Sequence, residues 1–357
     1  MIKDVEIENF RCFGKSKFSG FGRINLIGGK NNAGKTAFLE ALYLNHSPQV
    51  STLMQLRGMN QEVIKAYPEK AWDNLFLNQN QKSTITIKSL DENEVANMLA
   101  ITVGNSKIAD KESLSEVLLH DDESDISILN FTYRTGETAF PVVSLVAHSE
   151  GTLVKANGGL LSELNLKRKK IYWIPASGNS SHKSLAKLFE KCYLKGYCDK
   201  VMNAFQIIDS SIKNAITLNI GEPLIYLARQ PGNVMPLALF GDSLNRVADL
   251  FLKLVNNQKG ILLIDEIENG IHHTKQKELW EMLFDLTAEF NVQIFATTHS
   301  LEMLQAFAEV ASQIEGTEAG FYFEFARHIK TNQIIGIKYE MDVLEYGLTR
   351  QKGVRGE

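Results

Sequence analysis

The sequence GGKNNAGKTA, from Gly28 to Ala37, is the most informative motif of this chain. It lies between an apolar run, RINLI, and a run with helical spacing, FLEALYL. The pattern Gly-x4-Gly-Lys-Thr, which starts at Gly29, is typical of a phosphate-binding loop. In such a loop the backbone N–H groups converge on a phosphate at the start of a helix. Strand, loop and helix in this order predict an α/β fold with a nucleotide site.

Each part of the loop has a chemical role in this prediction. Lys35 neutralises charge on the β- and γ-phosphates of ATP, and the Thr36 hydroxyl is a ligand for Mg²⁺. The residues expected to contact the nucleotide here are Gly29, Asn31, Asn32, Ala33, Gly34, Lys35, Thr36 and Ala37.

Two later apolar runs also end in polar residues. GILLIDE ends in Asp265, predicted to hold Mg²⁺ through water, and Glu266, predicted to act as the general base on the attacking water. VQIFATTHS ends near His299, which is predicted to hydrogen-bond the γ-phosphate. Because ligands of open α/β sheets gather at the carboxyl ends of strands, we expect these side chains to join the phosphate loop.

The remaining pattern predicts one composite domain over residues 1–357, built on a mixed or parallel core sheet. β-branched and aromatic runs separated by turns, such as STITIKSL and ISILNFTYRTG, predict an antiparallel meander. The predicted parts are a short helical insertion at 49–80, an antiparallel β lobe at 81–175, a short helical lobe at 181–215 and a C-terminal half at 216–357.

Composition limits the classes of function. The formal net charge is −4, which argues against a uniformly basic surface and leaves DNA contact to a local patch. The densest basic run is KRKK, Lys167 to Lys170, beside Tyr172 and Trp173; it suits either a nucleic-acid contact or the solvated end of a strand. No apolar run suits a signal peptide or a membrane span, so a cytoplasmic protein without membrane contact is expected.

Together these motifs resemble the ABC-type ATPase heads of the SMC, RecF and OLD group, and most closely the OLD-like ATPases of bacterial anti-phage defence. The resemblance rests on the phosphate loop, on ILLIDEIENGIHH, on ATTHS, on LFGDSLNR and on the N-terminal ENFRCF. It implies that two copies sandwich ATP head to tail, as a homodimer or within a higher homo-oligomer.

The resemblance also implies further nucleotide contacts. LFGDSLNR occupies the signature position, so Gly241, Asp242 and Ser243 are expected to contact the γ-phosphate held by the partner copy. Phe240 and Ser243 depart from the patterns of transporters and of OLD-like relatives, respectively. The match of ENFRCF to RecF and SMC heads makes Arg11 an expected phosphate contact.

By this resemblance the chain is expected to be an Mg²⁺-dependent ATPase, the switch subunit of an anti-phage complex with a separately encoded effector, a Toprim-like nuclease. Two other readings stay open at this point. One is a RecF-like DNA clamp used in repair, and the other is a nucleotide-dependent scaffold with little turnover.

Overall fold

The computed structural model describes residues 1–104, 126–140, 143–149, 151–155, 169–178, 180–314 and 320–349. The chain divides into two compact units. Unit 1 comprises Met1–Phe21, Thr36–Arg168 and Ala326–Gly336; unit 2 comprises Gly22–Lys35, Lys169–Phe325 and Ile337–Glu357. The phosphate loop therefore belongs to unit 2 as far as Lys35.

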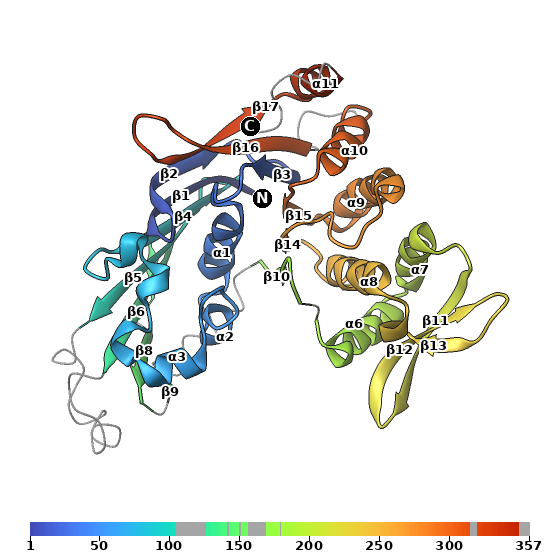
Figure 1. The fold of residues 1–357 in the computed structure, drawn as a ribbon, viewed down its shortest axis with the longest axis horizontal. Helices are drawn as coiled ribbons and strands as arrows, with labels where there is room; N and C mark the ends of the chain where they lie inside the picture. The colour runs from blue at the N-terminus through green and yellow to red at the C-terminus, as the bar shows by residue number, and fades with distance from the viewer. Residues whose placement is uncertain are drawn as a thin grey trace. The chain divides into compact units, whose positions relative to one another are not determined.

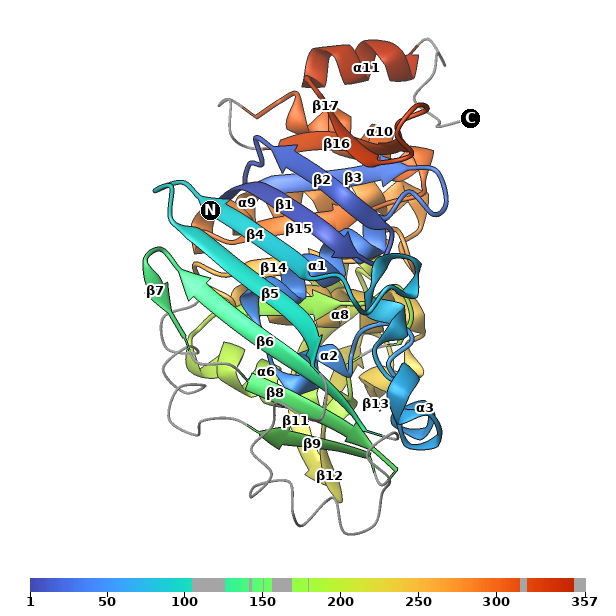
Figure 2. The same cartoon turned by 90° about the vertical axis from the view of Figure 1, so that its left-hand side faces the viewer.

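Unit 1 contains an eight-stranded antiparallel sheet, seen across its strands in Figure 2, in the order β2-β1-β4-β5-β6-β8-β9 with β7 paired to β6. In β4 buried residues alternate with partly exposed ones from Ile85 to Ser89, as a sheet with one covered face requires, whereas β8 ends in four consecutive buried residues. They are β1 (Ile2–Phe10), β2 (Phe13–Ser19), β4 (Ile85–Asp91), β5 (Ala96–Gly104), β6 (Ser127–Thr135), β7 (Thr138–Ala139), β8 (Val143–His148) and β9 (Gly151–Lys155).

Helix α1 (Lys35–His46) packs against this sheet within unit 1. The Phe38 ring meets the Phe18 ring edge to face, with centroids 5.0 Å apart. Buried Asn45 donates a 2.8 Å hydrogen bond to the Ile87 carbonyl of β4. Short helices follow α1: α2 (Val50–Leu53), α3 (Gln61–Ala66), η1 (Pro68–Lys70), η2 (Asp73–Leu75) and η3 (Leu77–Gln79).

Unit 2 is built around a second sheet, in the order β10-β14-β15-β3-β16-β17 (Figure 1). The strand pairs from β10 to β16 are parallel. The C-terminal ends of β3, β14 and β15 therefore lie at the same edge of the sheet. These strands are β3 (Ile24–Gly29), β10 (Ile171–Ile174), β14 (Ile261–Ile264), β15 (Gln293–Thr297), β16 (Gly320–Arg327) and β17 (Ile334–Tyr339).

Helices α8 (Asp242–Val255), α9 (Gln276–Phe290) and α10 (Leu301–Ala311) lie beside this sheet in Figure 1. Their apolar side chains belong to the same core cluster as those of β3, β14 and β15. Trp280 packs edge to face on Phe307, with centroids 5.0 Å apart. The remaining elements are α6 (His182–Leu194), α7 (Cys198–Ile208), β11 (Ile212–Ile220), β12 (Glu222–Arg229), β13 (Val234–Pro236), η6 (Leu237–Leu239), η7 (His273–Lys275) and α11 (Met341–Thr349).

The fold class expected from the sequence is confirmed: the chain has a P-loop α/β sheet together with an antiparallel sheet. Two local expectations were wrong. Residues 171–174, placed at the end of the antiparallel lobe, form β10 and pair in parallel with β14. Residues 212–215, placed in a helical lobe, begin β11 of a three-stranded sheet that the sequence reading missed. None of the helices in the described segments is both long and apolar enough to cross a membrane.

Candidate nucleotide-binding site

The loop that follows β3 contains two backbone conformations that favour glycine. Gly29 has φ +125° and Gly34 has φ +87°, both in the left-handed region. A Cβ atom on Gly29 would lie 2.2 Å from the Phe325 carbonyl oxygen, so β16 leaves no space for a side chain there. Thr36 and Ala37 follow directly in the first turn of α1. The phosphate loop predicted from the sequence therefore has the strand, tight turn and helix start that it requires.

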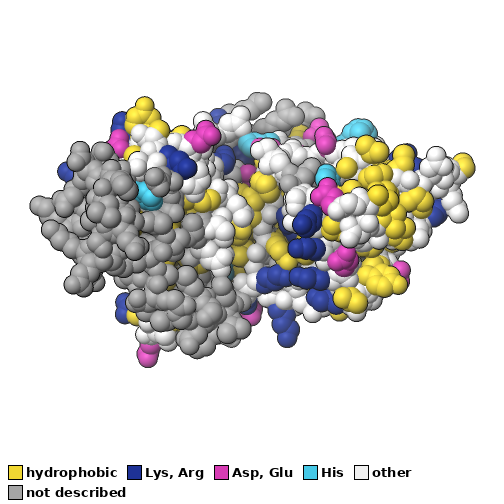
Figure 3. All heavy atoms as spheres, turned by 90° about the horizontal axis from the view of Figure 1, so that it is seen from below, with side chains coloured by type: hydrophobic (Ala, Val, Ile, Leu, Met, Phe, Trp, Pro, Cys, Tyr) yellow, Lys and Arg dark blue, Asp and Glu magenta, His cyan; other side chains and the backbone are white. Residues whose placement is uncertain are grey.

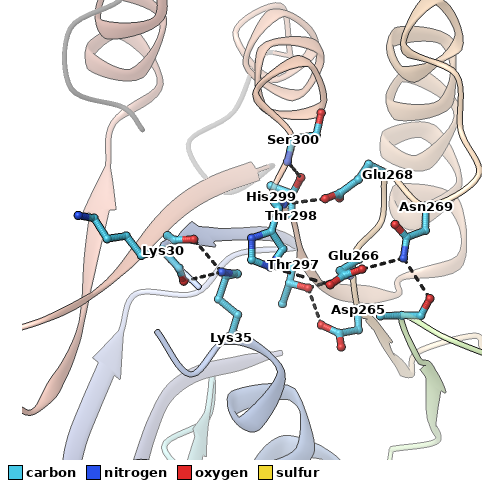
Figure 4. A network of polar contacts seen from close by, with 12 residues as sticks. Lys30, Lys35, Asp265, Glu266, Glu268, Asn269, Thr297, Thr298, His299 and Ser300 are labelled. Carbon is cyan, nitrogen blue, oxygen red and sulfur yellow. Dashed lines mark hydrogen bonds and ion pairs between the residues drawn. The ribbon is translucent and has the colours of Figure 1, made fainter. Parts of the chain in front are cut away.

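Lys35 is held inside this loop (Figure 4). Its side chain is buried, and Nζ donates hydrogen bonds to the carbonyl oxygens of Gly29 at 2.7 Å and Lys30 at 2.9 Å. Burial lowers the pKa of Lys35 to about 8, although the charges of Asp265, Glu268 and Glu266 oppose that shift. The ammonium is thus fixed in position before any phosphate is bound.

The two carboxylates after β14 are held by the neighbouring strand β15. The Thr297 hydroxyl donates to Asp265 Oδ1 at 2.7 Å and accepts from the backbone N–H of Glu266 at 2.8 Å. Asp265 is 4% exposed, whereas the Glu266 side chain is 37% exposed. The enclosed carboxylate of Asp265 suits a ligand of a metal ion. The exposed carboxylate of Glu266 suits a general base, which must reach water.

Figure 4 shows a polar network that orients Glu266. Asn269 donates to Glu266 Oε2 at 2.8 Å, and His299 Nε2 lies 3.9 Å from Glu266 Oε1. Glu268 in turn accepts a 2.7 Å hydrogen bond from the backbone N–H of His299. The structure therefore brings together Lys35, Asp265, Glu266 and His299, as the sequence predicted, and adds Glu268 and Asn269.

Sequence reasoning missed Arg246. Its side chain is buried in α8, and its guanidinium donates to the carbonyl oxygens of Pro175 and Asp265, each at 2.6 Å, and of Glu266 at 3.3 Å. Glu266 has φ +50°, an unfavourable backbone conformation for a residue with a side chain. Arg246 therefore holds the strained turn that carries both carboxylates. The one signal in the sequence was the position of this arginine among the apolar residues of a predicted helix, which indicates a buried charge that needs a partner.

The expected signature residues lie at the start of α8. Gly241, with φ +83°, is the N-cap, and Gly241 and Asp242 are exposed. The Ser243 hydroxyl donates to the Gly270 carbonyl in the turn after Glu266. The N–H groups of this first turn point out of a helix N-terminus, which favours an anion. Their contact with nucleotide stays a prediction.

Arg11 has protein partners within unit 1. Its Nε lies 2.8 Å from Glu40 Oε2, and its terminal nitrogens donate to the carbonyl oxygens of Arg57 at 2.7 Å and Asn74 at 3.1 Å. The Glu40 side chain is fully buried, so Arg11 neutralises a charge that would otherwise be costly. The phosphate contact expected of Arg11 stays a prediction, and it would require these bonds to rearrange.

The donor set of unit 2 fits Mg²⁺ and ATP. Gly29 permits the tight turn of the loop against β16, and Lys35 supplies a positioned positive charge. Oxygen ligands are those that Mg²⁺ prefers, and Asp265 offers a carboxylate at the sheet edge. When bound, Mg²⁺ would neutralise charge on the phosphates while Glu266 accepts a proton from water.

Comparisons with known proteins concern the family and the fold of this chain. The family model described as "AAA domain, putative AbiEii toxin, Type IV TA system" matches residues 24–304, a range that includes the phosphate loop, Asp265, Glu266 and His299. A Helicobacter pylori protein described as an ATP/GTP phosphatase is 25% identical over 338 residues, covering 87% of this chain and 88% of that protein.

Two solved structures share the fold. One is an SMC head bound to the C-winged helix domain of ScpA, with TM-score 0.52, 11% identity and coverage of 96% of this chain and 98% of that one. The other is an SMC head with an extended coiled coil bound to the C-terminal domain of ScpA, derived from Pyrococcus furiosus, with TM-score 0.50, 10% identity and 99% coverage of both chains. At such identity these likenesses concern the fold alone.

The first prediction concerns the pH dependence of ATP affinity. Because burial lowers the pKa of Lys35 to about 8, the nucleotide-free protein loses this positive charge as pH rises through that value. Bound phosphates favour the charged form, so affinity should fall by up to about tenfold per pH unit above the pKa of Lys35. Titration with a fluorescent ATP analogue between pH 7 and 9.5 measures this. Lys35→Arg should remove the dependence; a flat wild-type profile would contradict the assignment.

The second prediction concerns Arg246. In Arg246→Lys a single ammonium cannot hold the carbonyls of both Pro175 and Asp265, so the turn carrying Glu266 should shift. We expect kcat for ATP hydrolysis to fall about 10- to 100-fold with little change in KM. Phosphate release assays measure both constants. Arg23→Lys is the matched control, because Arg23 bonds Thr287 and Asn291 at the opposite end of β3. Equal kinetics for the two variants would refute the role.

Proposed function

This chain belongs to the AAA-domain family whose model it matches, and from that premise we propose that it is an ATP-driven switch. As a member of this family it is an ATPase. The proposed cycle has two states: ATP closes a head-to-tail dimer, and hydrolysis through Glu266 opens it again. The output would come from a separately encoded effector.

One observation supports hydrolysis above all. Glu266 is oriented by Asn269 on one oxygen and faces His299 on the other, while Thr297 and Arg246 hold its backbone. A general base needs a fixed carboxylate with one oxygen accessible to water, and this network provides it. A site used for nucleotide binding alone would not need Glu266 to be held in a strained conformation.

The signature residues support the head-to-tail dimer. Gly241 and Asp242 are exposed at the start of the otherwise buried helix α8, although Ser243 on the same turn is bonded to the catalytic segment through Gly270. An exposed helix N-terminus beside the catalytic turn suits a γ-phosphate brought by a second copy. Such contacts form with ATP and disappear when phosphate leaves, so they couple chemistry to dimerisation.

The third prediction uses Glu266→Gln. Loss of the carboxylate should lower the hydrolysis rate by about 100-fold or more, because an amide cannot accept the proton from water. ATP binding should persist, so the variant should accumulate as an ATP-bound dimer, whereas Lys35→Ala should lose affinity for ATP and stay monomeric. Phosphate release and light scattering after size exclusion, both with Mg²⁺ and ATP, provide the readouts.

The matched control is Glu278→Gln, an exposed residue on α9 paired with Lys275. It should behave as wild type. Unchanged turnover in Glu266→Gln would favour a scaffold over an ATPase switch. A mixture of Lys35→Ala and Ser243→Arg tests the head-to-tail arrangement, since one composite site in the mixed dimer keeps both an intact loop and an intact signature. An ATPase rate of the mixture above that of either variant alone supports the head-to-tail arrangement. A rate equal to the sum of the separate rates of the two variants contradicts it.

The effector is the fourth prediction. The resemblance to OLD-like ATPases of anti-phage defence supports a partner encoded in the same operon, such as a Toprim-like nuclease. Expression of the native operon with a tagged copy of this chain, followed by mass spectrometry, should recover one neighbouring gene product in constant stoichiometry. Its retention should differ between Glu266→Gln and Lys35→Ala, which are fixed in opposite states. Equal recovery with both variants would argue against control by ATP.

A further inference from the structure

Helix α6 carries a regular series of lysines on one face. Lys183, Lys187, Lys191 and the C-cap residue Lys195 follow one another at intervals of four residues, and all four are exposed. Residues four apart lie one above the next on a helix, so these side chains form a line. In Figure 3 lysine and arginine side chains form a band on the lower face of the molecule, where α6 lies in Figure 1. We call these four residues the α6 stripe.

The spacing of the α6 stripe is not explained by the stability of the helix, although Lys191 in the last turn and Lys195 at the C-cap suit the helix dipole. Like charges four residues apart repel each other, and the stripe contains three such pairs. The first turn of α6 has no acidic residue, and Lys183 places a cation at the positive end of the helix dipole. Across the segments that the structure describes, none of the four ammonium groups forms an ion pair or donates a hydrogen bond. Glu190 is the one acidic residue of α6.

Two more exposed lysines precede β10. Lys169 and Lys170 are exposed, and the Lys170 ammonium lies 4.5 Å from the centre of the Tyr172 ring. The positive charge of Lys191 partly offsets the rise that burial causes in the pKa of Tyr172. Lys167 and Arg168, the first half of the KRKK run, lie outside the described residues.

We propose that the α6 stripe binds the phosphate backbone of duplex DNA. From Lys183 to Lys195 the helix rises roughly 18 Å, and one strand of a duplex presents a phosphate about every 3.4 Å along the axis. The stripe therefore spans about five phosphates of one strand. Lysines act as flexible point charges, so the contact would be independent of base sequence.

A membrane is a poorer partner for this helix. An amphipathic helix enters a lipid surface with its apolar face. Five apolar residues of α6 are instead buried in the core of unit 2 with those of β12 and α8; they are Leu185, Ala186, Leu188, Phe189 and Cys192. Tyr193 and Leu194, at the C-terminal end of the helix, are the exceptions and are exposed. The exposed face carries the four lysines along its whole length, whereas two neighbouring apolar residues at one end do not make an apolar face.

This inference does not rest on the proposed function. The α6 stripe contributes no side chain to the network around Lys35 and Glu266, and it is exposed in a single copy of the chain. DNA binding should therefore need neither ATP nor dimerisation. It would place an ATP-driven switch on DNA, and it would hold even if no effector existed.

The fifth prediction uses the full chain with Lys183→Gln, Lys187→Gln and Lys191→Gln combined. Anisotropy of a fluorescein-labelled 30-base-pair duplex is measured without nucleotide at salt concentrations between about 25 and 200 mM. For wild type, the logarithm of affinity should fall with the logarithm of salt concentration at a slope of about −4, since each neutralised phosphate contributes roughly −0.9. The triple variant should lose about 3 units of that slope.

A matched triple variant carries the same change of charge elsewhere: Lys65→Gln, Lys82→Gln and Lys330→Gln, all exposed lysines of unit 1. It should bind the duplex as wild type does. Both triple variants should keep wild-type ATPase rates, and thermal melting should show the stripe variant to be folded. Lys35→Ala should bind the duplex normally, which separates this inference from the proposed cycle.

Four outcomes would overturn the proposal. They are absence of duplex binding by wild type at the lowest salt, a wild-type salt slope in the stripe variant, loss of binding in Lys35→Ala, and stripe-dependent binding to phosphatidylserine vesicles or to polyglutamate without binding to DNA. The last would assign the α6 stripe to a lipid surface or to an acidic protein.

Discussion

The turn after β14 sets the geometry of the nucleotide site. It must present two adjacent carboxylates at a sheet edge, one enclosed and one facing water, and Glu266 must adopt a left-handed backbone conformation to do so. Thr297 satisfies the side chain of Asp265 and the backbone N–H of Glu266, and Arg246 satisfies the carbonyls. Because all these partners come from other elements, the turn keeps its shape only when β15 and α8 are packed around it.

The charge balance of the site follows from the same arrangement. Lys35 is buried among backbone carbonyls, which stabilise its ammonium without neutralising it, while the nearest acidic groups act on it through space. An ammonium fixed in this way needs little reorganisation when phosphate arrives. Removing water from a lysine nevertheless makes its charged form less stable, and this explains why its pKa lies near the physiological range.

The sequence was informative where chemistry is carried by short motifs and uninformative where it depends on tertiary contacts. The glycine loop, Asp265, Glu266 and His299 could be predicted because each follows a recognisable strand, and parallel strands bring their ends together. β10 could not be assigned to its sheet, since four apolar residues do not reveal a pairing partner. Arg246 was missed because its role depends on carbonyl groups from two other elements. The partners of Arg11 were equally hidden, as Glu40 lies inside a helix whose pattern suggests only packing.

Helix α8 offers a physical reason for linking the nucleotide of one copy to the chemistry of another. Its first turn holds Ser243, which is bonded to Gly270, and one turn later Arg246 holds the backbone of Asp265 and Glu266. All residues from Leu244 to Val255 are buried, so this helix cannot bend freely between the two contacts. A displacement imposed at its exposed N-terminus would therefore reach the catalytic turn as a rigid shift. If a second copy binds its γ-phosphate at Gly241, the same helix that senses it also sets the position of Glu266.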